Sequence, residues 1–372
     1  MEMIRTICCK LTLDATADAH LRATQVAFNM AATWCAAVGW QLGIANKITL
    51  HDHVYYPIRA QFALGAQLTC CARDKAVEAI KTVRQHGDTS CPPFGPTSSI
   101  RYDARSYSLL ASDQVSLNTL HGRVRATLIL GDFQRQALAD SAWAIGGAEL
   151  IRRDATWYLH VTQNQPVPVH RPIRSSIGCD LGIVNLCTTD DGTQFSGATV
   201  KRIREKRFRH RQRLQKRGTR NAKRRLKKNS RKEQRFQKDI NHCMSKTLVK
   251  KAVVEQKALR LEDLTHIRQR TEATVRRSQR RQHSSWAFRQ LRDYITYKAQ
   301  QVGIPVILVN PRDTSRRCFV CGHIDNANRK TQAAFHCQNP SCGHIAAADV
   351  NAAKNIAFWA EVSQPIASPL RR

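Results

Sequence analysis

The most informative stretch of this 372-residue sequence is IGCDLGIVNLCTT, residues 177–189. Its first four residues predict a short buried strand that ends in Asp180, and residues 184–189 predict a second strand. Asp191-Gly192 is the dipeptide that tight hairpin turns favour, and residues 193–198 supply the returning strand. We therefore expect a new folded unit to begin here, with a carboxylate at the end of its first strand.

The sequence after this hairpin alternates between helical and strand patterns. Residues 200–257 are helical and very basic, with Gly218 as the break between two helices. Residues 258–262 and 305–309 predict two further strands, and a last helix is expected from Asp349 to about residue 362. A helical apolar stripe precedes the second of these strands and consists of Trp286, Leu291, Ile295 and Ala299. This order of elements is typical of an α/β or α+β unit.

The sequence before residue 177 has a different texture. Residues 4–13 predict a strand, and a helix is expected from Ala17, with Asp14 or Thr16 as its cap. A second helical stretch covers residues 58–83 after a break at residues 55–57. The β-like segments that follow cover residues 99–110, 115–130 and 148–161, with turns expected at Gly146-Gly147 and Asp154-Ala155. The pattern indicates a helical insert between β segments, and the prolines of residues 165–172 indicate an interdomain linker.

The net charge of the chain limits the classes of molecule that we expect it to bind. Sixty Lys and Arg residues against 28 Asp and Glu residues leave a formal net charge of +32 and a pI of about 10.3. A field of this size is self-repelling unless a polyanion screens it, so nucleic acid or an anionic membrane is implied. No apolar run approaches the roughly 18 residues of a membrane-spanning helix, and the N-terminus lacks the order of a signal peptide. We expect a soluble, cytoplasmic nucleic-acid binder.

Four of the 13 cysteines form a spaced cluster. Cys318-x2-Cys321 and Cys337-x4-Cys342 are two short pairs separated by a loop, which is the arrangement that delivers four thiolates to Zn²⁺. Two disulfides, or four unrelated buried thiols, are the alternatives. Because four cysteine ligands leave no open position, we expect this zinc to be structural.

Three acids stand at the ends of expected elements: Asp180 and Glu262 each close a strand, and Asp349 opens the last helix. Carboxylate oxygens are the ligands that Mg²⁺ prefers, and two such ions about 4 Å apart can catalyse phosphodiester hydrolysis. Singly, Asp349 would serve as a helix cap and Glu262 as a solvated acid. Spacing alone does not decide between these readings.

The basic tract at residues 201–232 is the third feature, because nearly every second residue is Lys or Arg. A solvated helix face is one interpretation. The other is a pair of helices that line a nucleic-acid channel and contact phosphates. Arg276-Arg277 and Arg280-Arg281 extend the same charge near Glu262 as part of a lid. The residues expected to bind nucleic acid are Lys201, Arg202, Arg204, Arg207, Arg211, Lys223, Arg224 and Arg225.

Four ordered motifs carry a resemblance to a known family. They are GCDLGIVNL at residues 178–186, LEDL at 261–264, Thr314-Ser315 with the four cysteines, and ADVNAA at 348–353. In this order they resemble the TnpB family of transposon-encoded proteins, relatives of the type V CRISPR effector nucleases, over about residues 175–360. Three features depart from the family pattern without removing a ligand: Cys179 before the Asp, the Cys-x4-Cys spacing, and the alanines at 346–348.

The resemblance implies an RNase H-like RuvC domain with an inserted zinc ribbon, and Asp180, Glu262 and Asp349 as its metal-binding catalytic triad. It also implies an N-terminal β-barrel wedge domain interrupted by a helical recognition insert. The boundaries expected on this basis are 1–14 and 92–168 for the wedge, 15–91 for the insert, 169–313 and 346–372 for the RuvC-like domain, and 314–345 for the ribbon.

The activity that the resemblance implies is RNA-guided, Mg²⁺-dependent cleavage of double-stranded DNA beside a short adjacent motif, with a guide RNA made from the transposon end. Two catalytic Mg²⁺ ions and one structural Zn²⁺ would be the cofactors. A catalytically silent guided DNA-binding repressor is an alternative, although such a protein is expected to have lost an acid of the triad. A transposase that acts by strand transfer is the other alternative.

Overall fold

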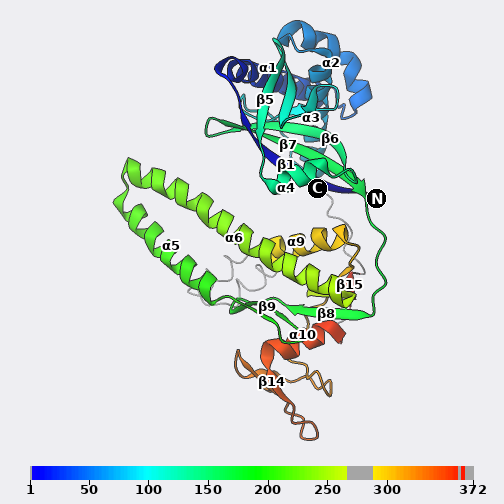
Figure 1. Ribbon diagram of the computed structural model, residues 1–372, viewed down its shortest axis with the longest axis vertical. Helices are drawn as coiled ribbons and strands as arrows, with labels where there is room; N and C mark the ends of the chain where they lie inside the picture. The colour runs from blue at the N-terminus through cyan, green and yellow to red at the C-terminus, as the bar shows by residue number, and fades with distance from the viewer. Residues whose placement is uncertain (1, 266–287, 359–361, 365–372) are drawn as a thin grey trace. The chain divides into compact units, whose positions relative to one another are not determined.

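The computed structural model describes residues 2–265, 288–358 and 362–364. The chain divides into two compact units, Met1–Pro166 and Val167–Arg372, whose elements are labelled in Figure 1. Each unit has its own sheet and its own hydrophobic core. The C-terminal unit carries all the acids and cysteines that the sequence singles out.

A seven-stranded antiparallel sheet forms the frame of the N-terminal unit. Buried and more exposed residues alternate along its strands, so one face packs on the core and the other meets solvent. In sheet order the strands are β2 (Ile100–Tyr102), β6 (Ala144–Arg153), β7 (Thr156–Pro166), β1 (Glu2–Thr12), β5 (Gly122–Ile129), β4 (Gln114–Thr119) and β3 (Tyr107–Leu110).

Three long helices follow β1 in the chain, and a short one, α4 (Asp132–Ala139), follows β5. The first, α1 (Ala15–Gln41), begins where the sequence indicates, and Asp14 is its cap: the Asp14 carboxylate accepts from the backbone N–H of Ala17 at 2.7 Å. The other two are α2 (Lys47–Phe62) and α3 (Ala66–Gln85). They pack with α1 in the core of the unit, and all three helices lie between β1 and β2 in the chain.

Two local predictions in this unit are wrong. The helix break expected at residues 55–57 lies instead at residues 63–65, because α2 continues through Pro57 and ends at Phe62, followed by Ala63 with a φ of +52°. The buried residues of α2 (Leu50, Val54 and Ile58) keep one apolar face across the proline, so packing outweighs the local penalty. Gly146-Gly147 is also not a turn but an irregularity inside β6, whereas Asp154-Ala155 is a turn with both φ angles positive.

The sheet of the C-terminal unit has six strands. Three of them, β8 (Ser175–Asp180), β11 (Lys257–Glu262) and β12 (Val306–Val309), are parallel neighbours. Antiparallel strands flank them, namely β9 (Asn185–Thr189) and β10 (Gln194–Ser196) on one side and β15 (Val362–Gln364) on the other. Strand β15 corrects the expectation that the last helix reaches residue 362, because Val362 pairs with Val309 instead.

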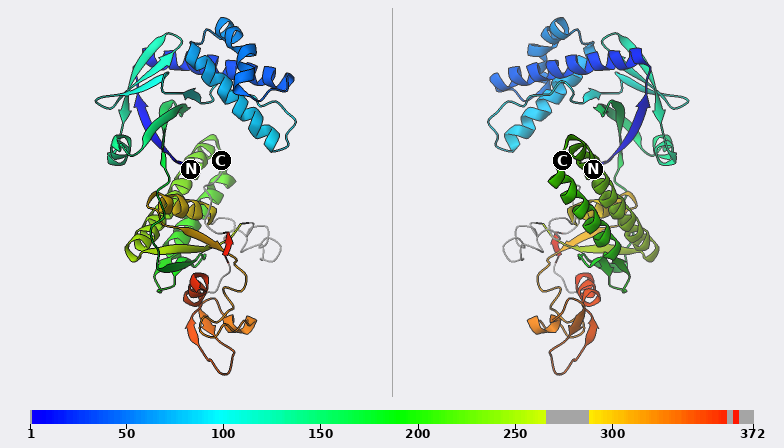
Figure 2. Two further views of the ribbon diagram at one scale, coloured as in Figure 1. Left: turned by 90° about the vertical axis from the view of Figure 1, so that its right-hand side faces the viewer. Right: turned by 90° about the vertical axis from the view of Figure 1, so that its left-hand side faces the viewer.

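Helices cover both faces of this sheet (Figures 1 and 2). On one face lie α6 (Arg220–Glu255) and α9 (Phe288–Gln301), and on the other α10 (Ala348–Phe358). The preceding helix, α5 (Ala198–Arg217), ends at Gly218, whose φ of +64° favours glycine, as expected for the break in the basic tract. The expected helix residue Trp286 lies outside the described residues.

Helix α10 lies directly on strand β8. A Cβ atom at Gly178 would stand 1.9 Å from the carbonyl oxygen of Ala353, so only glycine allows this approach. The segment before α10, residues 318–347 (hereafter the ribbon), holds the four cysteines, a 3₁₀ helix η1 (Asn326–Arg329) and the hairpin of β13 (Ala334–His336) and β14 (Ile345–Ala347). No described helix has the length and apolar character that crossing a membrane requires.

Candidate active site and metal centre

Asp180 and Glu262 lie at the same edge of the C-terminal sheet. Strands β8 and β11 are parallel, and Cys179 pairs with Leu261 in their register. The next residue on each strand is its last, so both carboxylates stand at the carboxyl ends of adjacent strands. This edge is where open α/β sheets place their ligands.

Asp349 also lies near these two acids, although the ribbon separates it from them in the sequence. It is the second residue of α10, and the close approach of Gly178 to Ala353 and Ala357 shows that this helix packs on β8. The Asp349 side chain is 15% exposed, and Glu262 is 9% exposed. The structure therefore brings together the three acids that the sequence distributes over 170 positions of the chain.

The pKa of Asp180 reflects the proximity of the other two acids. Burial, then the negative charges of Glu262 and Asp349, raise the pKa of Asp180 to about 8. Burial also raises the pKa of Glu262. Because the solvent accessibility of Asp180 is intermediate, its carboxylate is surrounded by protein atoms but still reachable. Carboxylates that repel each other in such a site favour a cation between them.

Three polar residues donate hydrogen bonds to two of the carboxylates. The sequence predicted no role for any of these three donors. Thr314 donates from Oγ1 to Glu262 Oε1 at 2.5 Å. Asn185 donates from Nδ2 to Asp349 Oδ2 at 2.9 Å, and Arg329 donates from Nη2 to Asp349 Oδ1 at 3.0 Å. Asn185 and Thr314 lie inside the quoted motifs, which was a usable signal, whereas Arg329 lies in the ribbon outside them.

The carboxylate cluster is wider than a site for one tightly held ion. Among the described residues, the four cysteines are the group whose candidate ligand atoms all lie within 4.8 Å of one another, and the three acids do not meet that spacing. A site for two ions about 4 Å apart does not require it, because each acid then needs to reach only its own ion. The donor set, three carboxylates, fits Mg²⁺.

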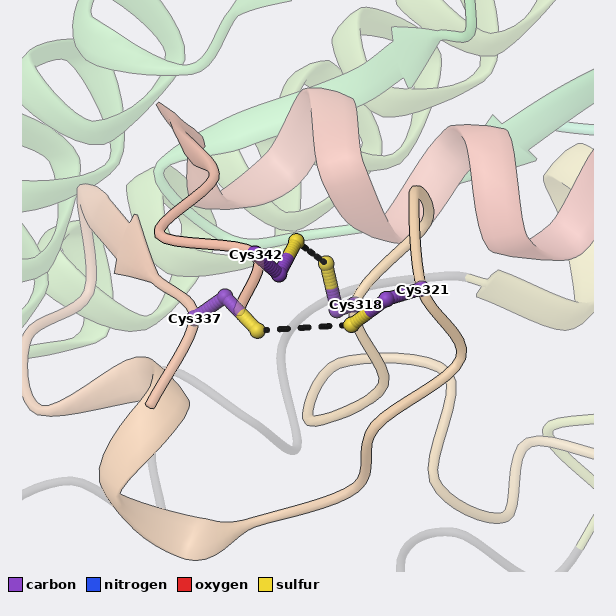
Figure 3. Close-up of side chains that lie close together, drawn as sticks. All are labelled: Cys318, Cys321, Cys337 and Cys342. Carbon is purple, nitrogen blue, oxygen red and sulfur yellow. Dashed lines mark hydrogen bonds between the residues drawn. The ribbon is translucent and has the colours of Figure 1, made fainter. Parts of the chain in front are cut away.

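The four cysteines converge as their spacing indicates (Figure 3). Sγ of Cys318 lies 3.8 Å from Sγ of Cys342, and Sγ of Cys321 lies 3.6 Å from Sγ of Cys337, and all four are free thiols. A hydrogen bond from the backbone N–H of His323, together with hydrogen bonds among the four cysteines, lowers the pKa of Cys321 to about 6, whereas burial raises the pKa of Cys337. The cluster therefore favours a thiolate, the form that metals bind, at Cys321. Four sulfur donors and no other ligand fit a closed, tetrahedral Zn²⁺ site.

The eight basic residues expected to bind nucleic acid fall into two groups. Arg207 lies with its guanidinium 4.7 Å from the ring centre of Phe236, and Arg211 is paired with Glu233 at 3.5 Å. These two residues and the half-buried Arg204 help to hold α5 against α6. The expected lid residues 276–281 lie outside the described residues. Arg211 is nevertheless exposed, as are the other five members, Lys201, Arg202, Lys223, Arg224 and Arg225.

Two family models match the chain. One, described as Cas12f1-like, TNB domain, matches residues 288–356, and the other, described as Probable transposase, matches residues 159–266. The two matches cover the strand that ends in Glu262, helix α9, the ribbon and most of α10. They include Asp180, Glu262, Asp349 and the four cysteines.

Similar proteins include three with informative names. CRISPR-associated endodeoxyribonuclease Cas12f1 of Sulfoacidibacillus thermotolerans is 40% identical over 33% of this chain and 27% of its own. Putative RNA-guided DNA endonuclease InsQ of Escherichia coli is 31% identical over 54% and 53%, and TnpB-like protein MJ0751 of Methanocaldococcus jannaschii is 34% identical over 44% and 58%. The chain thus spans about a quarter to somewhat more than half of these relatives.

Solved structures share the fold across nearly the whole chain. A Cas12f1–sgRNA–target DNA complex matches with a TM-score of 0.67 at 14% identity, covering 97% of this chain and 100% of the other. A mini-RNA-guided endonuclease, Cas_phi3, matches with a TM-score of 0.50 at 9% identity, covering 99% and 94%. At these identities the likeness concerns the fold.

The parallel strands β8, β11 and β12 with helices on both faces, together with these fold matches, define a RuvC-containing multidomain protein. Its four-cysteine ribbon, inserted before α10, is part of that definition. Within this class the chain is similar to TnpB-like protein MJ0751 and to the other relatives named above, in agreement with the resemblance that the sequence motifs carry.

Proposed function

We propose that this protein is an RNA-guided, Mg²⁺-dependent DNA endonuclease encoded by a transposon. The observation that carries the proposal is the cluster of Asp180, Glu262 and Asp349 at one edge of the sheet, where burial and mutual repulsion favour a bound cation. The names of the relatives, among them RNA-guided DNA endonuclease, support the same activity. The bound partners would be a guide RNA from the transposon end and double-stranded target DNA.

Each residue of the cluster has a distinct task in this proposal. Asp180, Glu262 and Asp349 would hold Mg²⁺, which when bound supplies an activated water and stabilises the leaving oxygen of a phosphodiester. Thr314 orients the Glu262 carboxylate, and Asn185 and Arg329 fix both oxygens of Asp349. Ligands held in this way need no rearrangement when substrate arrives.

The remaining parts of the chain have roles in the same proposal. Residues 1–14 and 92–168 would be the wedge domain around a recognition insert at 15–91. Residues 169–313 with 346–372 would be the RuvC-like domain around an inserted zinc domain at 314–345. The exposed arginines and lysines of α5 and α6 would contact phosphates without reading bases. The protein would act in the prokaryotic cytoplasm.

Cleavage of a matched target by the Asp180→Ala variant tests the proposal. The variant is expected to lose Mg²⁺-dependent cutting while it keeps RNA and DNA affinity, whereas Asp239→Ala, which removes an exposed acid of α6, is expected to cut normally. Cutting by Asp180→Ala would refute the assignment of the site. Target binding without cutting by the unmodified protein would indicate the repressor, and joined ends would indicate strand transfer.

The guide is tested separately by sequencing the RNA that copurifies with the protein from a host carrying its native locus. A discrete RNA that maps to the DNA flanking the gene is expected. Purification without any discrete RNA would refute guidance while leaving the metal site untouched.

A further inference from the structure

Thr188 carries a buried hydroxyl that the structure leaves without a partner. The residue is 1% exposed, and its Oγ1 has no hydrogen-bond partner among the residues that the structure describes. A buried hydroxyl in this state is destabilising relative to a bonded one. Its neighbour in β9, Thr189, is bonded to the Asp191 carboxylate at 2.5 Å, so the strand does not prevent such bonds.

The orphaned hydroxyl lies next to the carboxylate cluster. In the antiparallel pair of β8 and β9, Thr188 is directly opposite Asp180. Residues that face each other in this way project from the same side of the sheet, with Cβ atoms about 4.5–5.5 Å apart. Gly178, two residues before Asp180, contacts α10, so this is the side on which α10 and Asp349 lie.

Asp180 is also the acid that lacks a positioning partner. Glu262 accepts from Thr314, and Asp349 accepts from Asn185 and Arg329. No hydrogen bond to the Asp180 carboxylate is found among residues 2–265, 288–358 and 362–364. A buried donor without an acceptor thus faces a carboxylate without a donor across one strand pair.

We infer that Thr188 is the positioning residue of Asp180: its Oγ1–H donates to the carboxylate when that carboxylate holds a cation. The inference rests on the proposed function of the carboxylate cluster. It adds the Thr188 hydroxyl as the group that orients Asp180, one of the three proposed metal ligands. Such outer partners of metal ligands typically contribute 10- to 100-fold to metal affinity.

Two variants separate this role from a structural one. Thr188→Val keeps the shape of the side chain and removes the hydroxyl, and Thr188→Ser keeps the hydroxyl. Because the hydroxyl of Thr188 is unsatisfied in the metal-free protein, Thr188→Val is expected to unfold at the same temperature as the parent protein or a higher one. A structural role would lower that temperature instead, and such a result would overturn the inference.

The decisive experiment measures Mn²⁺ binding by electron paramagnetic resonance. The sample is the complex of the protein with its guide RNA and target DNA. Relative to the parent protein, Thr188→Val is expected to bind Mn²⁺ about tenfold more weakly, and Thr188→Ser within about threefold. Equal affinity of Thr188→Val and the parent would overturn the role of Thr188. Equal affinity of Asp180→Ala and the parent would refute the proposed function itself, so the two failures are distinguishable.

Discussion

Arg329 of the ribbon donates from Nη2 to Asp349 Oδ1 at 3.0 Å, and both side chains are 15% exposed. The positive charge of Arg329 also opposes the rise in the pKa values of Asp180 and Glu262 that burial causes. One residue of the ribbon therefore partly neutralises a cluster built from β8, β11 and α10. Through this hydrogen bond the ribbon contacts the candidate active site directly.

Replacing this arginine tests that coupling. Arg329→Gln is expected to slow target cleavage about 10- to 100-fold, because a hydrogen bond between charged groups contributes about 1.5–3 kcal/mol. Single-turnover cleavage rates would measure the effect. Arg312→Gln, which removes a largely exposed arginine close to the ribbon, is the matched control and should cut at the parent rate. Equal rates for the two variants would show that Arg329 has no part in the reaction.

The raised pKa of Asp180 predicts a pH-dependent stability. Its folded-state pKa of about 8 lies above the value of about 3.9 in unfolded chains, so the protonated form stabilises the fold. That contribution is full below about pH 4 and is lost as the pH rises to about 8. Asp180→Asn is therefore expected to unfold at a higher temperature than the parent at pH 8, with a smaller difference at pH 5.

The comparison requires protein that carries one equivalent of Zn²⁺ and no Mg²⁺, because a divalent cation at the cluster would mask the repulsion. Thermal unfolding followed by circular dichroism at several pH values would give the difference. Unfolding temperatures that differ by the same amount at pH 5 and pH 8 would contradict a raised pKa. Adding Mg²⁺ at pH 8 should raise the unfolding temperature of the parent more than that of the variant.

The four cysteines predict one zinc ion per chain, measurable by atomic emission spectrometry. Cys337→Ser is expected to lose the ion and, through the contact between Arg329 and Asp349, most cleavage activity. Cys243→Ser, which alters an exposed cysteine of α6, should retain both. A ribbon that resists chelators but responds to a reductant would indicate disulfides instead of zinc.

The two groups of basic residues predict two different phenotypes. Replacing Lys223, Arg224 and Arg225 with alanine should weaken RNA binding and reduce the slope of log affinity against log salt by about 2–3, because each lost phosphate contact removes about 0.7–0.9. Arg207→Ala should instead lower the unfolding temperature, because Arg207 packs on Phe236. Filter binding at several KCl concentrations and thermal unfolding would distinguish them; a reversed pattern would contradict the assignment.

Local chemistry determined most of what the sequence predicts correctly. The strands at β8, β9, β11 and β12 are short apolar runs, and Gly218 separates α5 from α6 because a positive φ favours glycine. The cysteine spacing indicates a closed metal site without any knowledge of the fold. The three acids were chosen through motifs that resemble a family, since no spacing rule joins residues so far apart.

Tertiary packing decided the rest. The continuation of α2 through Pro57 depends on the buried face of Leu50, Val54 and Ile58. The pairing of Val362 with Val309 depends on an open sheet edge. A pattern of a few neighbouring residues predicts neither feature. The partners of the acids were missed for the same reason. Arg329 meets Asp349 only because the ribbon folds back on α10, and Thr188 faces Asp180 only because β8 and β9 pair in one register. Sequence patterns report on neighbours along the chain, whereas a site is made of neighbours in space.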